Sequence, residues 1–177
     1  MRTSSHISLI TFLLIVILSA PSVAPAASSG RDPFGSAEAV VEELYQLVTM
    51  DPGTTPDWDR VRKLFIDNAI IVIRTARTET SVFDVEGFVA DFIAFIERAN
   101  INQTGFAETI IRKKTMVFGD IAHVLVLYEA MIPGSERKPQ RGVDSFQLIR
   151  KDNRWWIVSV VNEIPTPDRP VPAALRD

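Results

Sequence analysis

Few residues of this chain have side chains suited to nucleophilic or metal chemistry. The sequence contains no cysteine and two histidines, His6 and His123. Because His6 falls in an apolar N-terminal run, a multi-histidine metal site and a cysteine nucleophile are excluded from the body of the protein. The sequence contains no HExxH, P-loop, GxGxxG or GxSxG pattern. We therefore expect no metal and no cofactor, and we expect His123 to be a hydrogen-bonded surface or interface residue.

The N-terminus has the pattern of a signal peptide. Arg2 precedes an almost unbroken apolar run from Ile7 to Ala20, and Ala24-Pro25-Ala26 gives the small residues of a cleavage site. The run is shorter than the roughly 20 residues that a membrane span needs. We expect residues 1–26 to be a signal peptide and the protein to be periplasmic or secreted. The alternative is an anchor that is not cleaved.

The length and charge of the remaining chain limit its class. Without residues 1–26, 151 residues remain, with 22 acids and 18 bases, a formal charge of −4. This length suits one domain with a substantial core, and the mild acidity disfavours a nucleic-acid partner. We expect a linker over 27–35, one domain over 36–164 and a proline-rich tail extended over the surface at 165–177.

Apolar spacing and capping residues predict three helical segments before the main sheet. Ser36 can cap the first and Asp57 a short second one. Asp84 can cap the clearest amphipathic helix, Val85 to Ile96, in which apolar residues recur three and four positions apart. The β-branched stretch Ala69 to Ile73 predicts an early strand.

After Gly105 the apolar period changes to two, which predicts an antiparallel meander. Four strands are expected, over Phe106 to Phe118, Ile121 to Ile132, Gly142 to Arg150 and Trp155 to Asn162. The residues between them are turn formers, and Asp152-Asn153 tolerates the positive φ of a tight hairpin. Helices followed by a meander indicate an α+β fold in which the helices cover one face of the sheet.

Three segments, "LFIDNAIIVI", "FGDIAHVLVLYEA" and "RGVDSFQLIRKDNRWWIVSV", together resemble the NTF2-like superfamily, most of all its SnoaL-like and DUF4440-like bacterial members. The resemblance covers Ser36 to Glu163. It implies a cone-shaped, cystatin-like α+β barrel, in which the N-terminal helices pack on a strongly curved antiparallel sheet around a pocket. Members of this superfamily include isomerases, dehydratases, cyclases and binding modules, so the fold by itself assigns no function.

The resemblance also implies which side chains face the pocket, because the tryptophan of the W-x-I pattern usually lies on the convex side. Strand alternation then turns Trp155, Ile157, Ser159 and Val161 outward and Trp156, Val158, Val160 and Asn162 inward. The neighbouring strands are expected to contribute Ala122, Val124, Val126, Tyr128, Asp144, Phe146 and Leu148 to the inside. A one-residue slip or a bulge inverts these lists.

The expected pocket is apolar with a few polar groups, as ligand sites commonly are. We expect Tyr128, Phe146 and Trp156 to form aromatic walls, and Asp144 and Asn162 to be polar anchors. The alternative is that Asp144 and Asn162 only pair with backbone or water. Outside, Leu125, Leu127, Trp155 and Ile157 make the convex face apolar, which predicts a homodimer through this face.

Three functions follow from these expectations. The first is a non-catalytic exported domain, with no catalytic residue, that binds a small, mostly apolar ligand. The second is an acid–base enzyme of the isomerase, dehydratase or cyclase type, with Asp144 as the base and Tyr128 as the donor to an oxyanion. The third is a dimeric interaction or assembly module.

Overall fold

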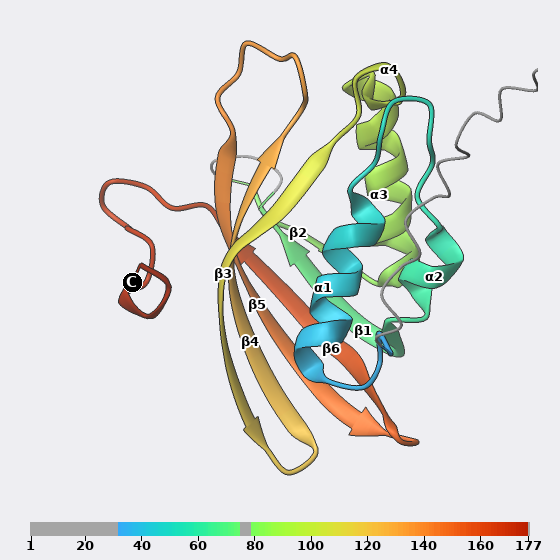
Figure 1. The fold of residues 1–177 in the computed structure, drawn as a ribbon, viewed down its shortest axis with the longest axis vertical. Coiled ribbons are helices and arrows are strands. Elements are labelled where there is room, and N and C mark those ends of the chain that lie inside the picture. Colours follow the sequence, from blue (N-terminus) through green and yellow to red (C-terminus); the bar gives the residue numbers. More distant parts are fainter. Residues whose placement is uncertain (1–31, 75–78, 177) are drawn as a thin grey trace, which may run out of the picture. The chain divides into compact units, whose positions relative to one another are not determined.

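The alternating segments build one curved, six-stranded sheet (Figure 1). The structure, a computed structural model, describes residues 32–74 and 79–176. The strands are β1 (Phe65–Ile73), β2 (Ser81–Phe83), β3 (Ala107–Phe118), β4 (Ile121–Met131), β5 (Gln140–Lys151) and β6 (Arg154–Glu163). Their order is β2-β1-β6-β5-β4-β3, so the described sheet has β2 and β3 as edges and is not closed. The predicted α+β class and the β3–β6 meander are confirmed, whereas β2 and the parallel pairing of β1 with β6 were not predicted.

The described helices are α1 (Ala37–Val48), α2 (Trp58–Arg62), α3 (Val85–Arg98), α4 (Ile101–Thr104) and the short 3-10 helix η1 (Ala173–Leu175). Helices α1, α2 and α3 begin at the predicted residues Ser36, Asp57 and Asp84, whereas α4 and η1 were not predicted. Ser36 Oγ accepts a hydrogen bond from the Ala39 N–H at 3.1 Å, and Asp57 and Asp84 cap α2 and α3 in the same way. None of the described helices combines the length and the apolar character that a membrane crossing requires.

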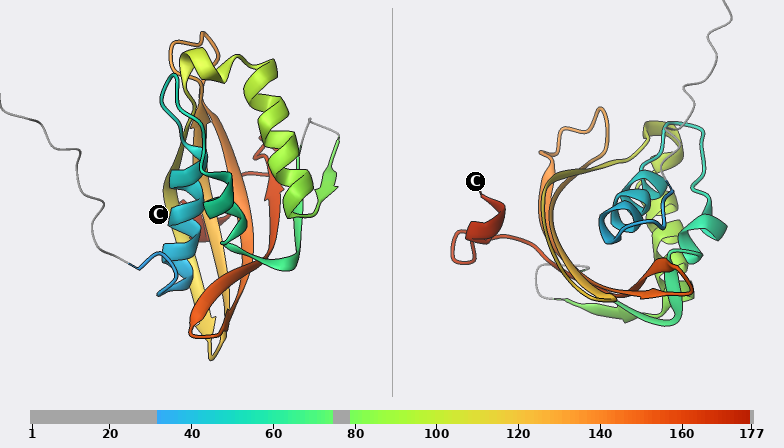
Figure 2. Two further views of the ribbon diagram at one scale, coloured as in Figure 1. Left: turned by 90° about the vertical axis from the view of Figure 1, so that its right-hand side faces the viewer. Right: turned by 60° about the horizontal axis from the view of Figure 1, so that its bottom comes forward.

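The core lies between the helices and the concave face of the sheet, as Figure 2 shows. Val40 and Val41 of α1 are fully buried, and so are Val124 and Phe146 on the sheet. Burying one such side chain contributes roughly 1.5–3 kcal/mol. This shared layer therefore holds α1 in place over the strands that carry the predicted site residues.

A bulge in β6 changes the predicted orientation of both tryptophans. Gln147 pairs with Ser159 but the next residue, Leu148, pairs with Ile157, which leaves Val158 as the extra residue. Beyond the bulge, Val160 and Asn162 face inward as predicted. Before the bulge the alternation is reversed. Trp155 is only 7% exposed and belongs to the core, and its neighbour Trp156 lies on the other face.

The C-terminal segment lies on the convex side of the sheet (Figure 2). It is not extended throughout, because η1 packs against β3 and buries Leu175 completely. Leu127, predicted to be an exposed residue of the convex face, is buried as well. Together with the inward positions of Trp155 and Ile157, this corrects three of the four residues predicted for the dimer surface.

Candidate functional site

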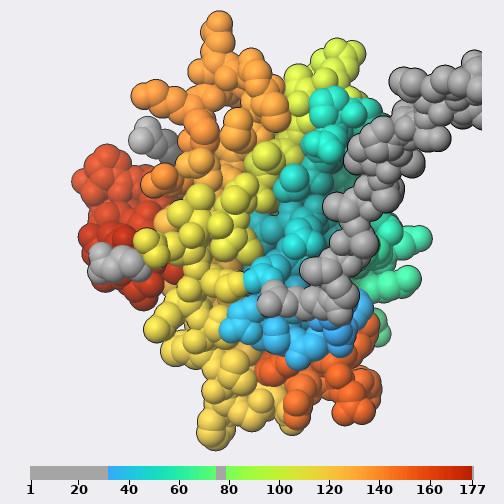
Figure 3. Space-filling model, in the orientation of Figure 1, coloured from blue at the N-terminus to red at the C-terminus, as the bar shows by residue number. Residues whose placement is uncertain are grey.

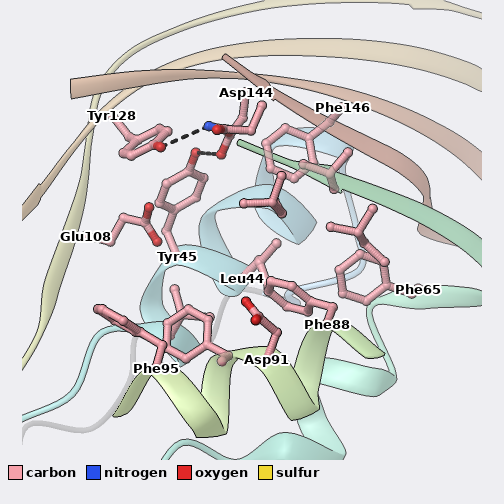
Figure 4. Close-up of a pocket in the computed structure, with 16 residues that line it drawn as sticks. Leu44, Tyr45, Phe65, Phe88, Asp91, Phe95, Glu108, Tyr128, Asp144 and Phe146 are labelled. Atoms are coloured by element: carbon pink, nitrogen blue, oxygen red, sulfur yellow. Dashed lines mark hydrogen bonds between the residues drawn. The ribbon is translucent and has the colours of Figure 1, made fainter. Parts of the chain in front are cut away.

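A cavity of about 200 Å³ lies between the concave face of the sheet and helices α1 and α3 (Figure 4). Aromatic rings form most of its wall, and polar side chains gather on the side of β4, β5 and β6. The lining residues are Leu44, Tyr45, Val48, Phe65, Ile71, Ile73, Phe88, Asp91, Phe92, Phe95, Glu108, Tyr128, Asp144, Phe146, Val160 and Asn162. An apolar cavity with a few converging polar groups has the composition of a small-molecule site.

The Asp144 carboxylate is the centre of a hydrogen-bond network. The Tyr45 hydroxyl donates to Asp144 Oδ2 at 2.6 Å, and Asn162 Nδ2 donates to Asp144 Oδ1 at 2.7 Å. Asn162 Nδ2 also donates to the Tyr128 hydroxyl oxygen at 2.9 Å. The network thus joins α1 to three adjacent strands and fixes the positions of two phenols beside one carboxylate.

Strand pairing brings these groups together. Asp144 and Asn162 are directly opposite each other on β5 and β6, and Tyr128 of β4 lies opposite Gly142. A Cβ at Gly142 would come within 2.2 Å of Tyr128 ring atoms. Glycine is therefore required here because the Tyr128 ring lies across the backbone of β5.

Burial changes the proton affinity of the groups in the network. It raises the pKa of Asp144 to about 6, although the hydrogen bonds from Tyr45 and Asn162 act in the opposite direction. Burial also raises the pKa of both tyrosines well above the ordinary value, with the charge of Asp144 adding to the effect. Both phenols therefore remain protonated donors at neutral pH, while Asp144 is mainly ionised.

Two further carboxylates point into the cavity. Glu108 of β3 lies next to Tyr45, and Asp91 rises from α3 between Phe88 and Phe95 (Figure 4). Burial, followed by the charge of Asp144, raises the pKa of Glu108 to about 8. Tyr45 and Glu108 also line a groove between α1 and β3. Figure 3 shows the face of the molecule on which the side chains of α1 and β3 meet. These two residues thus separate the cavity from solvent on that side.

Solved structures share this architecture. An NTF2-like protein with a cystatin-like fold from Novosphingobium aromaticivorans matches with a TM-score of 0.58 at 16% identity, over 77% of this chain and 82% of that one. The chain has the NTF2-like fold. At this level of identity the similarity shows the fold alone.

Two further solved structures with this fold are described as putative enzymes. A putative scytalone dehydratase from Novosphingobium aromaticivorans has a TM-score of 0.55 at 11% identity, over 73% of this chain and 81% of that one. A putative ketosteroid isomerase from Shewanella frigidimarina has a TM-score of 0.51 at 18% identity, over 70% of this chain and 91% of that one. No family model and no curated protein matches the sequence.

Four of the five predicted ligand-binding residues line the cavity of the NTF2-like domain: Tyr128, Asp144, Phe146 and Asn162. The fifth, Trp156, does not, because the β6 bulge turns it to the opposite face. Its Nε1 donates to the Lys151 carbonyl, and the Arg154 guanidinium lies 3.7 Å from its ring centre. His123 lies outside the cavity and its Nε2 is 3.0 Å from Ser145 Oγ, in agreement with its predicted role.

Three polar lining residues were missed, namely Tyr45 and Asp91 on helices and Glu108 on β3. Tyr45 lies on the buried face of α1, four residues after Val41 and three before Val48. Asp91 has Phe88 three residues before it and Phe95 four residues after it on α3. Helical spacing alone places the Tyr45 and Asp91 side chains on the apolar face of their helices. Both could therefore have been found from the sequence, as polar residues within a predicted apolar stripe.

Proposed function

We propose that this NTF2-like domain binds a small, mostly apolar molecule in the cavity. The observation that carries the proposal is the arrangement of a ring-lined space of about 200 Å³ around one hydrogen-bonded polar network. An apolar cavity of about 150 Å³ holds a molecule the size of benzene. A single substituted ring therefore fits the cavity, with its polar group near Asp144, Tyr45 and Tyr128.

A substitution that fills the cavity tests whether a ligand binds there. The probe is 4-ethylphenol, a single substituted ring, and saturation near 100 times its Kd is expected to raise the free energy of unfolding by about 2.7 kcal/mol. In Val160→Phe the added ring enters the cavity and should abolish this gain. Val161→Phe is the matched control, because Val161 is the next residue and faces the convex side, 46% exposed. Equal stabilisation of both variants by 4-ethylphenol would contradict binding in the cavity.

The acid–base alternative has support from the carboxylates. Asp144 and Glu108, with pKa values of about 6 and 8, line one cavity together with two protonated phenols. A carboxylate of this kind can remove a proton next to a carbonyl while a phenol donates to the forming oxyanion. Two solved structures of similar fold, described as a putative scytalone dehydratase and a putative ketosteroid isomerase, also support this chemistry as the second candidate.

Proton exchange distinguishes catalysis from binding. If Asp144 is a base, the protein should speed deuterium uptake from D₂O at the benzylic α-carbon of phenylacetone, a one-ring ketone, followed by NMR. Asp144→Asn should remove the acceleration, while Asp120→Asn, at an exposed carboxylate paired with Arg150, should keep it. Uptake at the buffer rate with the wild-type protein would count against catalysis on this probe and leave binding intact.

Export and self-association belong to this proposal as well. Residues 1–31 lie outside the described part of the chain, so cleavage after Ala26 rests on the sequence pattern. The intact mass of protein recovered from a periplasmic or secreted fraction measures it. The proposal of self-association rests on the apolar side chains of the convex face. In the structure these are Met116, Phe118, Ile121 and Val161, together with Leu125 from the predicted set.

A further inference from the structure

The charge inside the cavity is not balanced. Its lining contains three carboxylates, Asp91, Glu108 and Asp144, and among the described residues it contains no lysine, arginine or histidine. Asp144 accepts two hydrogen bonds, but Asp91 and the Glu108 side chain form no hydrogen bond or ion pair within residues 32–74 and 79–176. Carboxylates removed from water are normally paired, so an uncompensated set favours a positively charged partner.

Elsewhere in the described chain, several carboxylates that are partly or largely exposed have cationic partners. Glu86 pairs with Arg62 at 2.7 Å, and Glu163 pairs with Arg169 at 2.8 Å. Glu129 pairs with Arg141 at 3.1 Å. The sequence thus supplies arginines to carboxylates on the surface and none to those that line the cavity.

The rings of the wall are an independent observation that points to a cation. Five phenylalanines and two tyrosines line the cavity: Phe65, Phe88, Phe92, Phe95, Phe146, Tyr45 and Tyr128. The face of an aromatic ring carries partial negative charge, which attracts an ammonium group as well as an apolar body. The carboxylates and the aromatic rings therefore both favour a ligand that carries a positive charge.

We propose that the cavity selects a protonated hydrophobic amine, whose positive charge is balanced by the carboxylates Asp91, Glu108 and Asp144 around the lining and whose apolar body lies against the phenylalanines. This inference rests on the proposed binding function and names its ligand class. An ammonium group has three N–H donors and no acceptor, so it suits a lining whose carboxylates are hydrogen-bond acceptors. The cavity volume of about 200 Å³ limits the body to about one ring with a short chain.

Three probes of nearly one size but different charge test the inference by calorimetry at pH 7. They are 2-phenylethylamine, which is a cation, 2-phenylethanol, which is neutral, and phenylacetate, which is an anion. The amine is expected to bind at least about tenfold more tightly than the alcohol. Phenylacetate is expected to bind most weakly, because the negative charge that Asp144 and the rest of the lining carry at pH 7 repels it.

Variants locate the source of this preference. Asp91→Asn and Glu108→Gln should each reduce the ratio of amine to alcohol affinity about threefold or more while alcohol affinity stays the same. Glu97→Gln is the matched control, since it removes one charge from the exposed side of α3 and should leave the ratio unchanged. Asp91→Asn is the principal variant, because Asp91 forms no hydrogen bond within the described chain that its loss would break.

The outcomes separate the ligand class from binding itself. Alcohol binding equal to or tighter than amine binding would overturn the amine proposal and leave the binding function in place. A preference for the amine that Asp91→Asn and Glu108→Gln do not reduce would overturn it too, because the cation would then bind elsewhere. If none of the three probes binds and 4-ethylphenol fails as well, the binding function fails and the amine proposal fails with it.

Discussion

The two faces of the sheet are built from alternate residues of the same strands, but their side chains are satisfied in different ways. On the concave face, Val124 and Phe146 are fully buried, and the polar groups bond to one another. On the convex face, Phe118 is 84% exposed and Met116 61% exposed. The concave face is thus determined by its own packing, whereas the convex face has apolar side chains with room for a partner. Substitutions on the two faces should therefore differ in kind.

The largest difference is expected between the adjacent tryptophans. Trp155→Ala removes a core side chain and should lower the free energy of unfolding by about 3–5 kcal/mol. Trp156→Ala removes a partly exposed ring with a cation–π contact to Arg154 and should cost about 1 kcal/mol. Urea denaturation of both variants measures the contrast. Greater destabilisation by Trp156→Ala would mean that the bulge at Val158 is absent and that the predicted alternation was right.

A second test addresses the glycine beneath the Tyr128 ring. Gly142→Ala places a methyl group against that ring and should destabilise the protein by about 1–3 kcal/mol. Tyr128→Val removes the ring, so in its presence Gly142→Ala should cost much less. A double-mutant cycle measured by thermal unfolding gives the coupling. Additive effects of the two substitutions would show that the ring does not lie over Gly142.

The carboxylates of the concave face should make stability depend on pH. Burial raises the pKa of Glu108 to about 8 and that of Asp144 to about 6, so the folded protein binds protons more tightly than the unfolded chain. The stability that these two groups contribute is fully present below their pKa values in the unfolded chain. It is lost as the pH rises through their pKa values in the folded protein. Stability should therefore fall between about pH 4.5 and pH 8.

The variant Glu108→Gln isolates the upper part of this window. The difference in melting temperature between Glu108→Gln and wild type should grow in favour of the variant as pH rises to 8. Glu97→Gln serves as the exposed control and should follow wild type. A constant difference across the window would show that Glu108 is already ionised at low pH and is not desolvated.

The smallest effect on folding is expected on the convex face. Phe118→Asp changes an exposed side chain at the end of β3, so the stability of the monomer should change by no more than about 0.5 kcal/mol. Light scattering of the wild type should give a dimer, and Phe118→Asp should give a monomer because a charge would be buried at the interface. A monomeric wild type at high concentration would remove the convex face as a dimer surface. Trp155→Asp cannot serve this test, because Trp155 belongs to the core.

Local signals in the sequence determined much of the fold. Capping by Ser36, Asp57 and Asp84 depends on a side chain and an N–H three residues later, and all three were predicted. Asp152 and Asn153 both have positive φ, as the tight hairpin required. Alternation along β4 and β5 placed Tyr128, Asp144 and Phe146 correctly, because these two strands are paired without a shift in register.

Only the tertiary structure decided the orientation of the tryptophans and the full set of cavity residues. A bulge adds one residue to a strand without a local signal in the sequence, since it is fixed by how β5 and β6 pair across the sheet. Likewise, Tyr45 is separated from Asp144 by 99 positions, and no local pattern states that the two meet at 2.6 Å. Apolar periodicity and helix capping depend on residues only a few positions apart. They can therefore be recognised within a single segment of the sequence. The polar network and its unbalanced charge arise from contacts between a helix and distant strands, which exist only when the sheet has curved around α1.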